Sequence, residues 1–126
     1  MMYEVLVEGG FTARHGVRLP DGNIEPLHTH DWGVTVRFAG RELDECGLLV
    51  NFDAVKSALN AVLARFEHTD LNQNPAMCGL NPTAEHVAKV IFEAMLQRWN
   101  GDERLRSVRV SEAPHAAAVY GREVRG

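Results

Sequence analysis

The sequence predicts an α+β domain in which two helices pack on one face of an antiparallel sheet. Three observations support this fold class. Segments near both ends of the chain alternate apolar and polar residues, which is typical of strands with one buried face. Two segments in the middle carry apolar residues at helical spacing. Because the strands come in groups before and after the helix pair, this order favours an antiparallel sheet over a parallel sheet with alternating helices.

Five segments are expected to form strands. The alternation begins at residues 2–8, and the Gly-Gly pair that follows predicts a bulge or bend. The clearest alternation covers residues 32–38, in which tryptophan, valine and phenylalanine share one face. The short apolar segment 48–52 is predicted to be the third strand, and residues 105–112 and 116–124 are predicted to be the last two.

Two amphipathic helices are expected between the third and fourth strands. They cover residues 53–66 and residues around 87–95, where apolar side chains recur every three to four positions. Either Asn51 or Asp53 is available as the N-cap of the first helix. A proline precedes Thr83 at the start of the second helix, and Thr83 is predicted to be its cap.

Length and composition exclude several classes of protein function and indicate a single domain. At 126 residues the chain is expected to form one domain, residues 1–126. Its net charge of −4, with both signs interspersed, lacks the Lys and Arg cluster that nucleic-acid binding requires. No stretch approaches the roughly 20 apolar residues that cross a membrane. Glu4 and Glu8 stand where a secretion signal is basic, so we expect a cytoplasmic protein in which Cys46 and Cys78 stay unpaired.

Three of the six histidines have a spacing that suits a metal site. His28 and His30 lie two residues apart on an expected strand, so their side chains point to the same face. His15, near the end of the first strand, supplies a third imidazole if that strand pairs with the second. Three imidazoles with an open fourth position are typical of catalytic zinc sites. Spacing alone leaves two interpretations open, a zinc site and ordinary surface or hydrogen-bonded histidines.

Several segments taken together indicate a family. The segments "FTARH", "HTHDWGVTV", "GLLVNFDAVKSAL", "FEHTDLN", "NPTAEHVA" and "VRVSEAP" follow one another along almost the whole chain. In wording and order they resemble the 6-pyruvoyl tetrahydropterin synthase and 6-carboxytetrahydropterin synthase family. The resemblance implies the tunnelling fold, in which the sheets of three subunits close a barrel and two trimers stack into a homohexamer. Such pairing protects strand edges that one small sheet would expose.

The resemblance also implies the residues of a pterin site. The three histidines named above are then expected to hold Zn²⁺. Glu112 in "VSEAP" is expected to accept two N–H bonds from the pterin ring, a bidentate contact that suits a carboxylate. His68 corresponds to a family histidine that carries a proton, and either Glu67 or Asp70 is expected to orient its ring.

The chain departs from the family at one catalytic position. The synthases carry a cysteine shortly before the H-x-H segment, whereas this chain has "GNIEPLHTH". Glu25, three residues before His28, is the natural candidate to take the place of that cysteine. Relatives that resemble this chain in having glutamate there cleave the side chain of dihydroneopterin triphosphate to a hydroxymethylpterin. The proton-abstraction step therefore has to be assigned anew in this chain.

Three functions follow from this comparison. The first is a zinc-dependent pterin-forming lyase that acts on 7,8-dihydroneopterin triphosphate, in a route to deazapurine products such as queuosine or to folate-type products. The second is a side-chain-cleaving variant that produces 6-hydroxymethyl-dihydropterin, with Glu25 as the base. The third is a non-catalytic module that binds pterins or purines and has lost turnover together with the cysteine.

Overall fold

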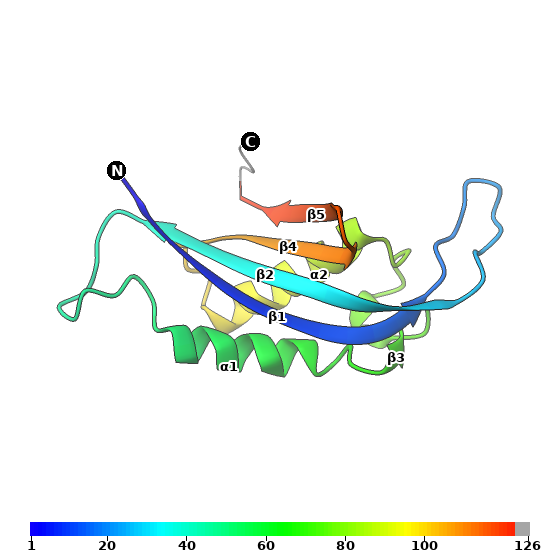
Figure 1. The fold of residues 1–126 in the computed structure, drawn as a ribbon, viewed down its shortest axis with the longest axis horizontal. Coiled ribbons are helices and arrows are strands. Elements are labelled where there is room, and N and C mark those ends of the chain that lie inside the picture. Colours follow the sequence, from blue (N-terminus) through cyan, green and yellow to red (C-terminus); the bar gives the residue numbers. More distant parts are fainter. Residues whose placement is uncertain (123–126) are drawn as a thin grey trace.

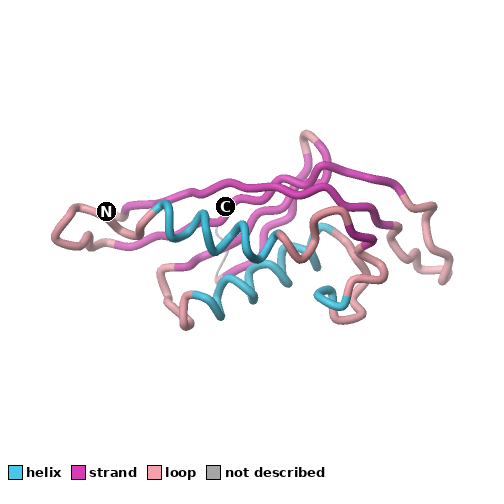
Figure 2. The backbone as a smooth tube through the Cα atoms, turned by 90° about the horizontal axis from the view of Figure 1, so that it is seen from below, coloured by secondary structure: helices cyan, strands magenta, loops and turns pink. Residues whose placement is uncertain are grey.

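The computed structural model describes residues 1–122, which form a five-stranded sheet with both α-helices on one face (Figure 1). In chain order the elements are β1 (Tyr3–His15), β2 (His28–Gly40), α1 (Phe52–Leu63), β3 (Thr69–Asp70), the 3₁₀ helix η1 (Pro75–Met77), α2 (Ala84–Arg98), β4 (Leu105–Ala113) and β5 (Ala116–Gly121). Across the sheet the strand order is β3-β1-β2-β4-β5. Figure 2 shows the two helices running along the same side of the sheet. The predicted α+β class is confirmed.

The two longest strands, β1 and β2, form one antiparallel ladder that ends with His15 opposite His28. The bulge predicted as one possibility at the Gly-Gly pair is not formed, because β1 pairs with β2 in unbroken register through both glycines. Gly10 allows close packing instead: a Cβ atom there would lie 2.8 Å from the carbonyl oxygen of Trp32. A long, unbroken ladder therefore carries both histidine segments to the same end of the sheet.

The predicted strand at 48–52 is not formed. Leu49 and Val50 are buried, which explains the apolar pattern, but they lie in the connection between β2 and α1. The carbonyl of Leu49 accepts a hydrogen bond from Arg104 Nη1 at 2.6 Å instead of joining a ladder. The side chain of Asn51 then caps α1. A short run of buried apolar residues has the same sequence pattern in a strand and in a connection that packs against the core.

A two-residue strand that the pattern did not predict, β3, lies at one edge of the sheet. It pairs in parallel with β1, Ala13 with Thr69 and Arg14 with Asp70. All other strand pairs are antiparallel, as predicted. Of the last predicted strand, 116–124, the final two residues lie outside the described part of the chain.

Both predicted helices are present with different ends. The first helix stops before Phe66, which follows in a turn and is fully buried. Its N-cap is Asn51 and not Asp53, because the Asn51 side chain accepts a bond from a backbone N–H in the first turn. Thr83 caps α2, as predicted, by accepting from the backbone N–H of His86 at 3.1 Å.

The core lies between the helices and the inner face of the sheet. Burying a large apolar side chain there stabilises the fold by about 1.5–3 kcal/mol. Phe11 and Trp32 stack with ring centroids 5.6 Å apart, and the Trp32 ring also lies 4.8 Å from that of His15. The histidine end of the sheet thus rests directly on packed aromatic rings.

Two further predictions bear on the described residues. Cys46 and Cys78 are free thiols, as expected. Within residues 1–122, neither α-helix is long and apolar enough to cross a membrane.

Candidate metal centre and active site

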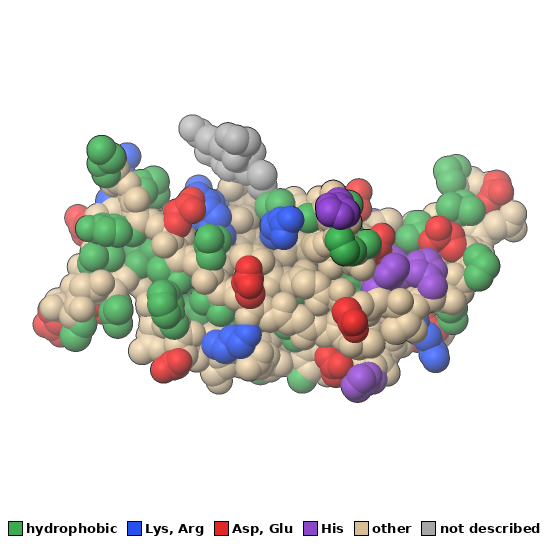
Figure 3. Space-filling view, viewed as in Figure 1, with side chains coloured by type: hydrophobic (Ala, Val, Ile, Leu, Met, Phe, Trp, Pro, Cys, Tyr) green, Lys and Arg blue, Asp and Glu red, His purple; other side chains and the backbone are tan. Residues whose placement is uncertain are grey.

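Three imidazoles meet at the end of the β1–β2 ladder. His15 is the last residue of β1, and His28 and His30 begin β2 on the same inner face. The ring centroids are separated by 4.8 Å (His15–His28), 5.4 Å (His15–His30) and 4.7 Å (His28–His30). One nitrogen from each ring lies within 4.8 Å of the others. Figure 3 shows histidine side chains gathered at the end of the molecule from which the loop between β1 and β2 projects.

Backbone carbonyls determine which nitrogen of two rings is available. His15 Nδ1 lies 2.7 Å from the carbonyl oxygen of Pro82, and His28 Nδ1 lies 3.0 Å from that of Pro26. A carbonyl oxygen only accepts, so each Nδ1 carries the hydrogen and each Nε2 keeps its lone pair. Metal-binding histidines are commonly oriented in this way. The donor set therefore fits a zinc ion, and the three histidines are the residues that would hold it.

Glu112 of β4 completes one side of this cluster. Its Oε2 atom lies 3.1 Å from His15 Nε2, and both atoms are buried without forming a hydrogen bond. The same side chain lines a hollow of about 360 Å³ together with Glu85 and Ala116. The carboxylate that the sequence predicted as the pterin anchor is thus in the wall of a hollow next to the histidines.

The segment that follows His15 is held by two asparagine side chains that sequence reasoning did not single out. Asn72 accepts from the backbone N–H of Gly16 at 2.8 Å and donates to its carbonyl at 2.7 Å. Asn81 makes the same pair of bonds to Arg18, at 2.7 and 3.0 Å. Each side-chain amide thereby forms the two backbone hydrogen bonds that a neighbouring strand would otherwise provide. The only sequence signal is the asparagine-rich composition of residues 72–81.

Glu25 is held on the opposite edge of the same segment. Its Oε1 atom accepts from the backbone N–H of Val17 at 2.8 Å, and its own N–H donates to the Val17 carbonyl at 3.0 Å. Gly16 is required here, because a Cβ atom would lie 2.3 Å from the carbonyl oxygen of Glu25. The predicted base is thus attached two residues beyond His15, with one carboxylate oxygen committed to the backbone.

The structure distinguishes the two acids proposed to orient His68. Glu67 Oε1 lies 3.2 Å from His68 Nε2, while its other oxygen accepts from the backbone N–H of Thr12 at 3.3 Å. Asp70 contacts Arg14 instead, with Oδ2 4.0 Å from Nε. The His68 side chain is 77% exposed. Glu67 is therefore the residue that pairs with His68.

The histidine cluster and the Glu67–His68 pair are separate groups within one chain. Arg14 and Asp70 are paired in the sheet and point to its outer face, whereas His15, the next residue, points inward. The described contacts join neither His68 nor Asp70 to the cluster.

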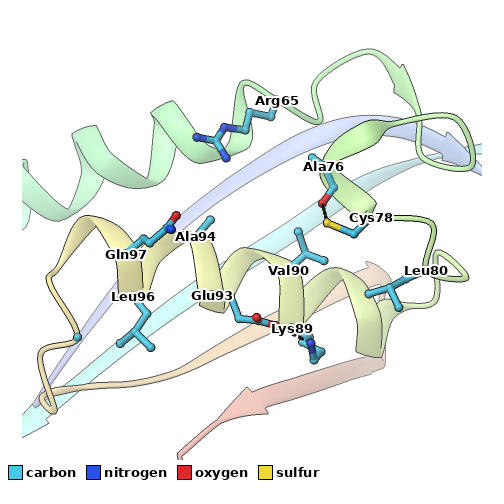
Figure 4. A pocket seen from close by; sticks show the side chains of 11 residues that line it. Arg65, Ala76, Cys78, Leu80, Lys89, Val90, Glu93, Ala94, Leu96 and Gln97 are labelled. Atoms are coloured by element: carbon cyan, nitrogen blue, oxygen red, sulfur yellow. Dashed lines mark hydrogen bonds and ion pairs between the residues drawn. The ribbon is translucent and has the colours of Figure 1, made fainter.

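A hollow larger than the one beside Glu112 lies elsewhere. It measures about 610 Å³ and is lined mainly by residues of α2, together with Arg65 just after α1, Ala76 of η1 and Cys78 just after it (Figure 4). On its rim Lys89 bonds Glu93 at 2.6 Å, and this hydrogen bond raises the pKa of Lys89 above its usual value. All site residues predicted from the sequence lie within the described part of the chain, and none of them lines this hollow. Its size therefore does not make it the active site.

The fold and the cluster define a class of small α+β domains with a three-histidine site beside a carboxylate-walled hollow. The family model for 6-pyruvoyl tetrahydropterin synthase matches residues 4–123. The chain belongs to this family of pterin synthases, and the family predicted from its segments is confirmed.

Individual relatives agree with this assignment. The 6-carboxy-5,6,7,8-tetrahydropterin synthase of Bacillus subtilis (strain 168) is 32% identical over 106 residues, which are 79% of this chain and 70% of that protein. The 6-pyruvoyl tetrahydropterin synthase of Caenorhabditis elegans superposes with a TM-score of 0.82 at 18% identity and 96% coverage of both chains. A Plasmodium vivax 6-pyruvoyltetrahydropterin synthase, a catalytic residue mutant with glutamate replaced by alanine, gives 0.79 at 18% identity, covering 98% and 99% of the two chains. The two solved structures establish the tunnelling fold.

Proposed function

We propose that this protein is a zinc-dependent pterin-forming lyase that acts on 7,8-dihydroneopterin triphosphate. The observation that carries the proposal is the meeting of three imidazole nitrogens within 4.8 Å, beside a hollow walled by Glu112. The Bacillus subtilis relative, named as a 6-carboxytetrahydropterin synthase, supports a pterin product. Such a product is an intermediate on the way to deazapurines such as queuosine or to folate-type compounds.

The chain's own residues have distinct tasks in this proposal. Glu112 binds the amino-pyrimidine edge of the pterin by charge-assisted hydrogen bonds. His68 carries a proton to or from the substrate, and the carboxylate of Glu67, 3.2 Å from its Nε2, orients the ring and stabilises its charged form. When bound at the three histidines, zinc withdraws electron density from substrate oxygens and lowers the barrier to proton removal or to breaking the adjacent C–C bond.

A second candidate is the side-chain-cleaving variant that produces 6-hydroxymethyl-dihydropterin. Glu25 favours it, because this residue is the candidate to replace the family cysteine and its carboxylate is held beside the segment that follows His15. The catalytic glutamate of the Plasmodium vivax enzyme gives this assignment a precedent.

Base strength also favours that candidate. A carboxylate with an ordinary pKa of about 4.3 is a much weaker base than a thiolate with a pKa of about 8.5. Glu25 is therefore better suited to accept a proton from a substrate hydroxyl than from carbon. Removing a hydroxyl proton starts a retro-aldol cleavage of the neighbouring C–C bond, and that step releases the side chain.

The proposal includes a homohexamer built as two stacked trimers. The separation of the Glu67–His68 pair from the histidine cluster supports it, because no described contact joins the two groups within one chain. A neighbouring copy that brings its His68 to the cluster completes the site. The exposed edge strands β3 and β5 are available to pair with further copies.

One experiment separates the three functions. Purified protein is analysed for metal content and incubated with 7,8-dihydroneopterin triphosphate, and the pterin product is identified by mass. A 6-pyruvoyl or 6-carboxy product supports the first candidate, and a 6-hydroxymethyl product supports the second. Tight pterin binding without any product after long incubation would instead identify a binding module.

A further inference from the structure

The contact between His15 and Glu112 requires a positive charge between its two atoms. His15 Nδ1 donates to Pro82, so Nε2 presents a lone pair. Glu112 Oε2 presents another lone pair at 3.1 Å, and neither atom has a hydrogen-bond partner. Two buried acceptors at this distance repel each other unless a proton or a metal ion lies between them. Their relative orientation does not meet the geometry of a hydrogen bond, which favours the metal ion.

The distance between these atoms suits neighbouring ligands of one zinc ion. Zinc binds imidazole nitrogen at about 2.0–2.1 Å and carboxylate oxygen at about 2.0–2.2 Å in tetrahedral sites, so adjacent donor atoms lie about 3.3–3.4 Å apart. The observed distance of 3.1 Å between His15 Nε2 and Glu112 Oε2 is close to this separation of adjacent donor atoms. Burial points the same way, since the His15 side chain is only 1% exposed and water does not reach Oε2.

The rest of the Glu112 side chain faces the hollow. The side chain as a whole is 36% exposed although its Oε2 is not, so its accessible part lies on the side of the hollow lined by Glu85 and Ala116. One carboxylate therefore borders both the histidine cluster and the predicted pterin pocket.

We propose that Glu112 is the fourth protein ligand of the metal ion and links that ion to the pterin pocket. This inference rests on the proposed zinc site and adds a role for Glu112 besides anchoring the pterin. N–H groups of a bound pterin compete with the metal for the electron density of the same carboxylate. Pterin binding therefore weakens the Glu112–metal bond and leaves the ion more electron-poor when substrate is present. The coupling is reciprocal, so the metal content of the site also changes pterin affinity.

Cobalt(II) is a suitable probe, because its visible absorption responds to the ligands and to their number. Wild type, Glu112→Gln and the control Glu45→Gln, an exposed glutamate in the loop after β2, are titrated with Co²⁺ and then with neopterin, which lacks the triphosphate. Glu112→Gln is expected to bind Co²⁺ about 10–100-fold more weakly than wild type, whereas Glu45→Gln is expected to match wild type. Neopterin is expected to shift the Co²⁺ spectrum of wild type and of Glu45→Gln.

The outcomes separate this inference from the proposed function. If Co²⁺ binds through the histidines but Glu112→Gln matches wild type in affinity and spectrum, the fourth-ligand role is wrong and the zinc site stands. If wild type binds no Co²⁺, both proposals are wrong. Thermal unfolding of each variant establishes that it is folded. Should Glu112→Gln fail to fold, the Co²⁺ spectrum of the wild-type protein still tests the proposal. A spectrum that saturating neopterin leaves unchanged would overturn the proposed coupling between pterin binding and the Glu112–metal bond.

Discussion

Single side chains hold the candidate site in place before any metal binds. The backbone carbonyls of Pro82 and Pro26 orient the rings of His15 and His28, and each ring keeps Nε2 as its free donor atom. His30 completes the cluster from the same face of β2. The removal of any one ring leaves only two imidazole donors, one fewer than in zinc sites that are built on three histidines.

Replacing His30 with alanine is expected to lower metal affinity by at least about 10-fold, because one of three imidazole ligands is lost. The measurement is metal content per chain after dialysis, by mass spectrometry of the elements. His115→Asn is the matched control: His115 lies outside the cluster in a turn with φ of 75°, a conformation that asparagine tolerates. Equal metal content in His30→Ala and wild type would contradict the assignment.

Replacing Glu25 with glutamine is expected to reduce turnover by about 10²–10⁴-fold with metal content unchanged. The amide oxygen of glutamine still accepts the Val17 N–H bond, so the loop keeps its shape while the basic oxygen is lost. Steady-state rates and metal content are compared with those of Glu42→Gln, an exposed change in another loop. Full activity of Glu25→Gln would reject the base.

At the scale of elements, two connections hold the ladder of β1 and β2 in place. At the histidine end, Asn72 and Asn81 bind the segment after β1 as a neighbouring strand would. At the other end, Arg104 ties the start of β4 to the connection before α1 through the Leu49 carbonyl. Buried and half-buried backbone groups are thereby satisfied without further strands.

Asn72→Ala is expected to lower the free energy of unfolding by about 1–3 kcal/mol, because both polar backbone groups of Gly16 lose their partner. Urea denaturation followed by fluorescence measures the change. Asn60→Ala, on the exposed face of α1, should stay within about 0.5 kcal/mol of wild type. Similar losses in both variants would show that the Asn72 bonds contribute little.

The Asp102–Arg104 pair predicts a pH dependence of stability. Hydrogen bonds from Arg104, one of them 2.7 Å long, lower the pKa of Asp102 below its usual value. A depressed carboxyl pKa stabilises the fold at neutral pH, and this contribution is lost as pH falls through the folded-state pKa. Asp102→Asn should therefore be less stable than wild type at pH 7, with the difference shrinking in acid. A difference independent of pH, measured by urea unfolding between pH 3 and 7, would argue against this origin.

At the scale of the whole molecule, the residues proposed for catalysis form two separate groups. The imidazoles of His15, His28 and His30 meet at the end of the β1–β2 ladder, whereas His68 pairs with Glu67 and no described contact joins that pair to the imidazoles. In the proposed hexamer, a second copy brings its His68 to the histidine cluster. The exposed sheet edges make such an assembly possible.

A mixing experiment tests the shared site. We expect sedimentation to give six chains per particle. His28→Ala and His68→Ala should each be inactive alone, but after dissociation and joint reassembly about one quarter of wild-type turnover should return, because random pairing unites intact halves. A mixture as inactive as its parents would show that each site lies within one chain, and mixtures prepared without dissociation provide the control.

The sequence alone predicted the fold class, both helices with the Thr83 cap, and the family, together with the histidines that the structure brings together. The fold class and the helices are revealed by periodic or local patterns. The family and its three histidines were predicted from the resemblance of several segments in order, since spacing alone left the histidines undecided. The strand predicted at 48–52 was wrong, because residues buried in a connection and residues buried in a strand give the same apolar pattern.

Only the tertiary structure decided how distant segments meet. It paired β3 with β1, placed Glu67 rather than Asp70 beside His68, and brought Glu112 to 3.1 Å from His15. It also showed no contact between the Glu67–His68 pair and the histidine cluster within the described residues. Such contacts join residues far apart in the chain, and their geometry depends on strand register and on side-chain direction, which no local pattern encodes.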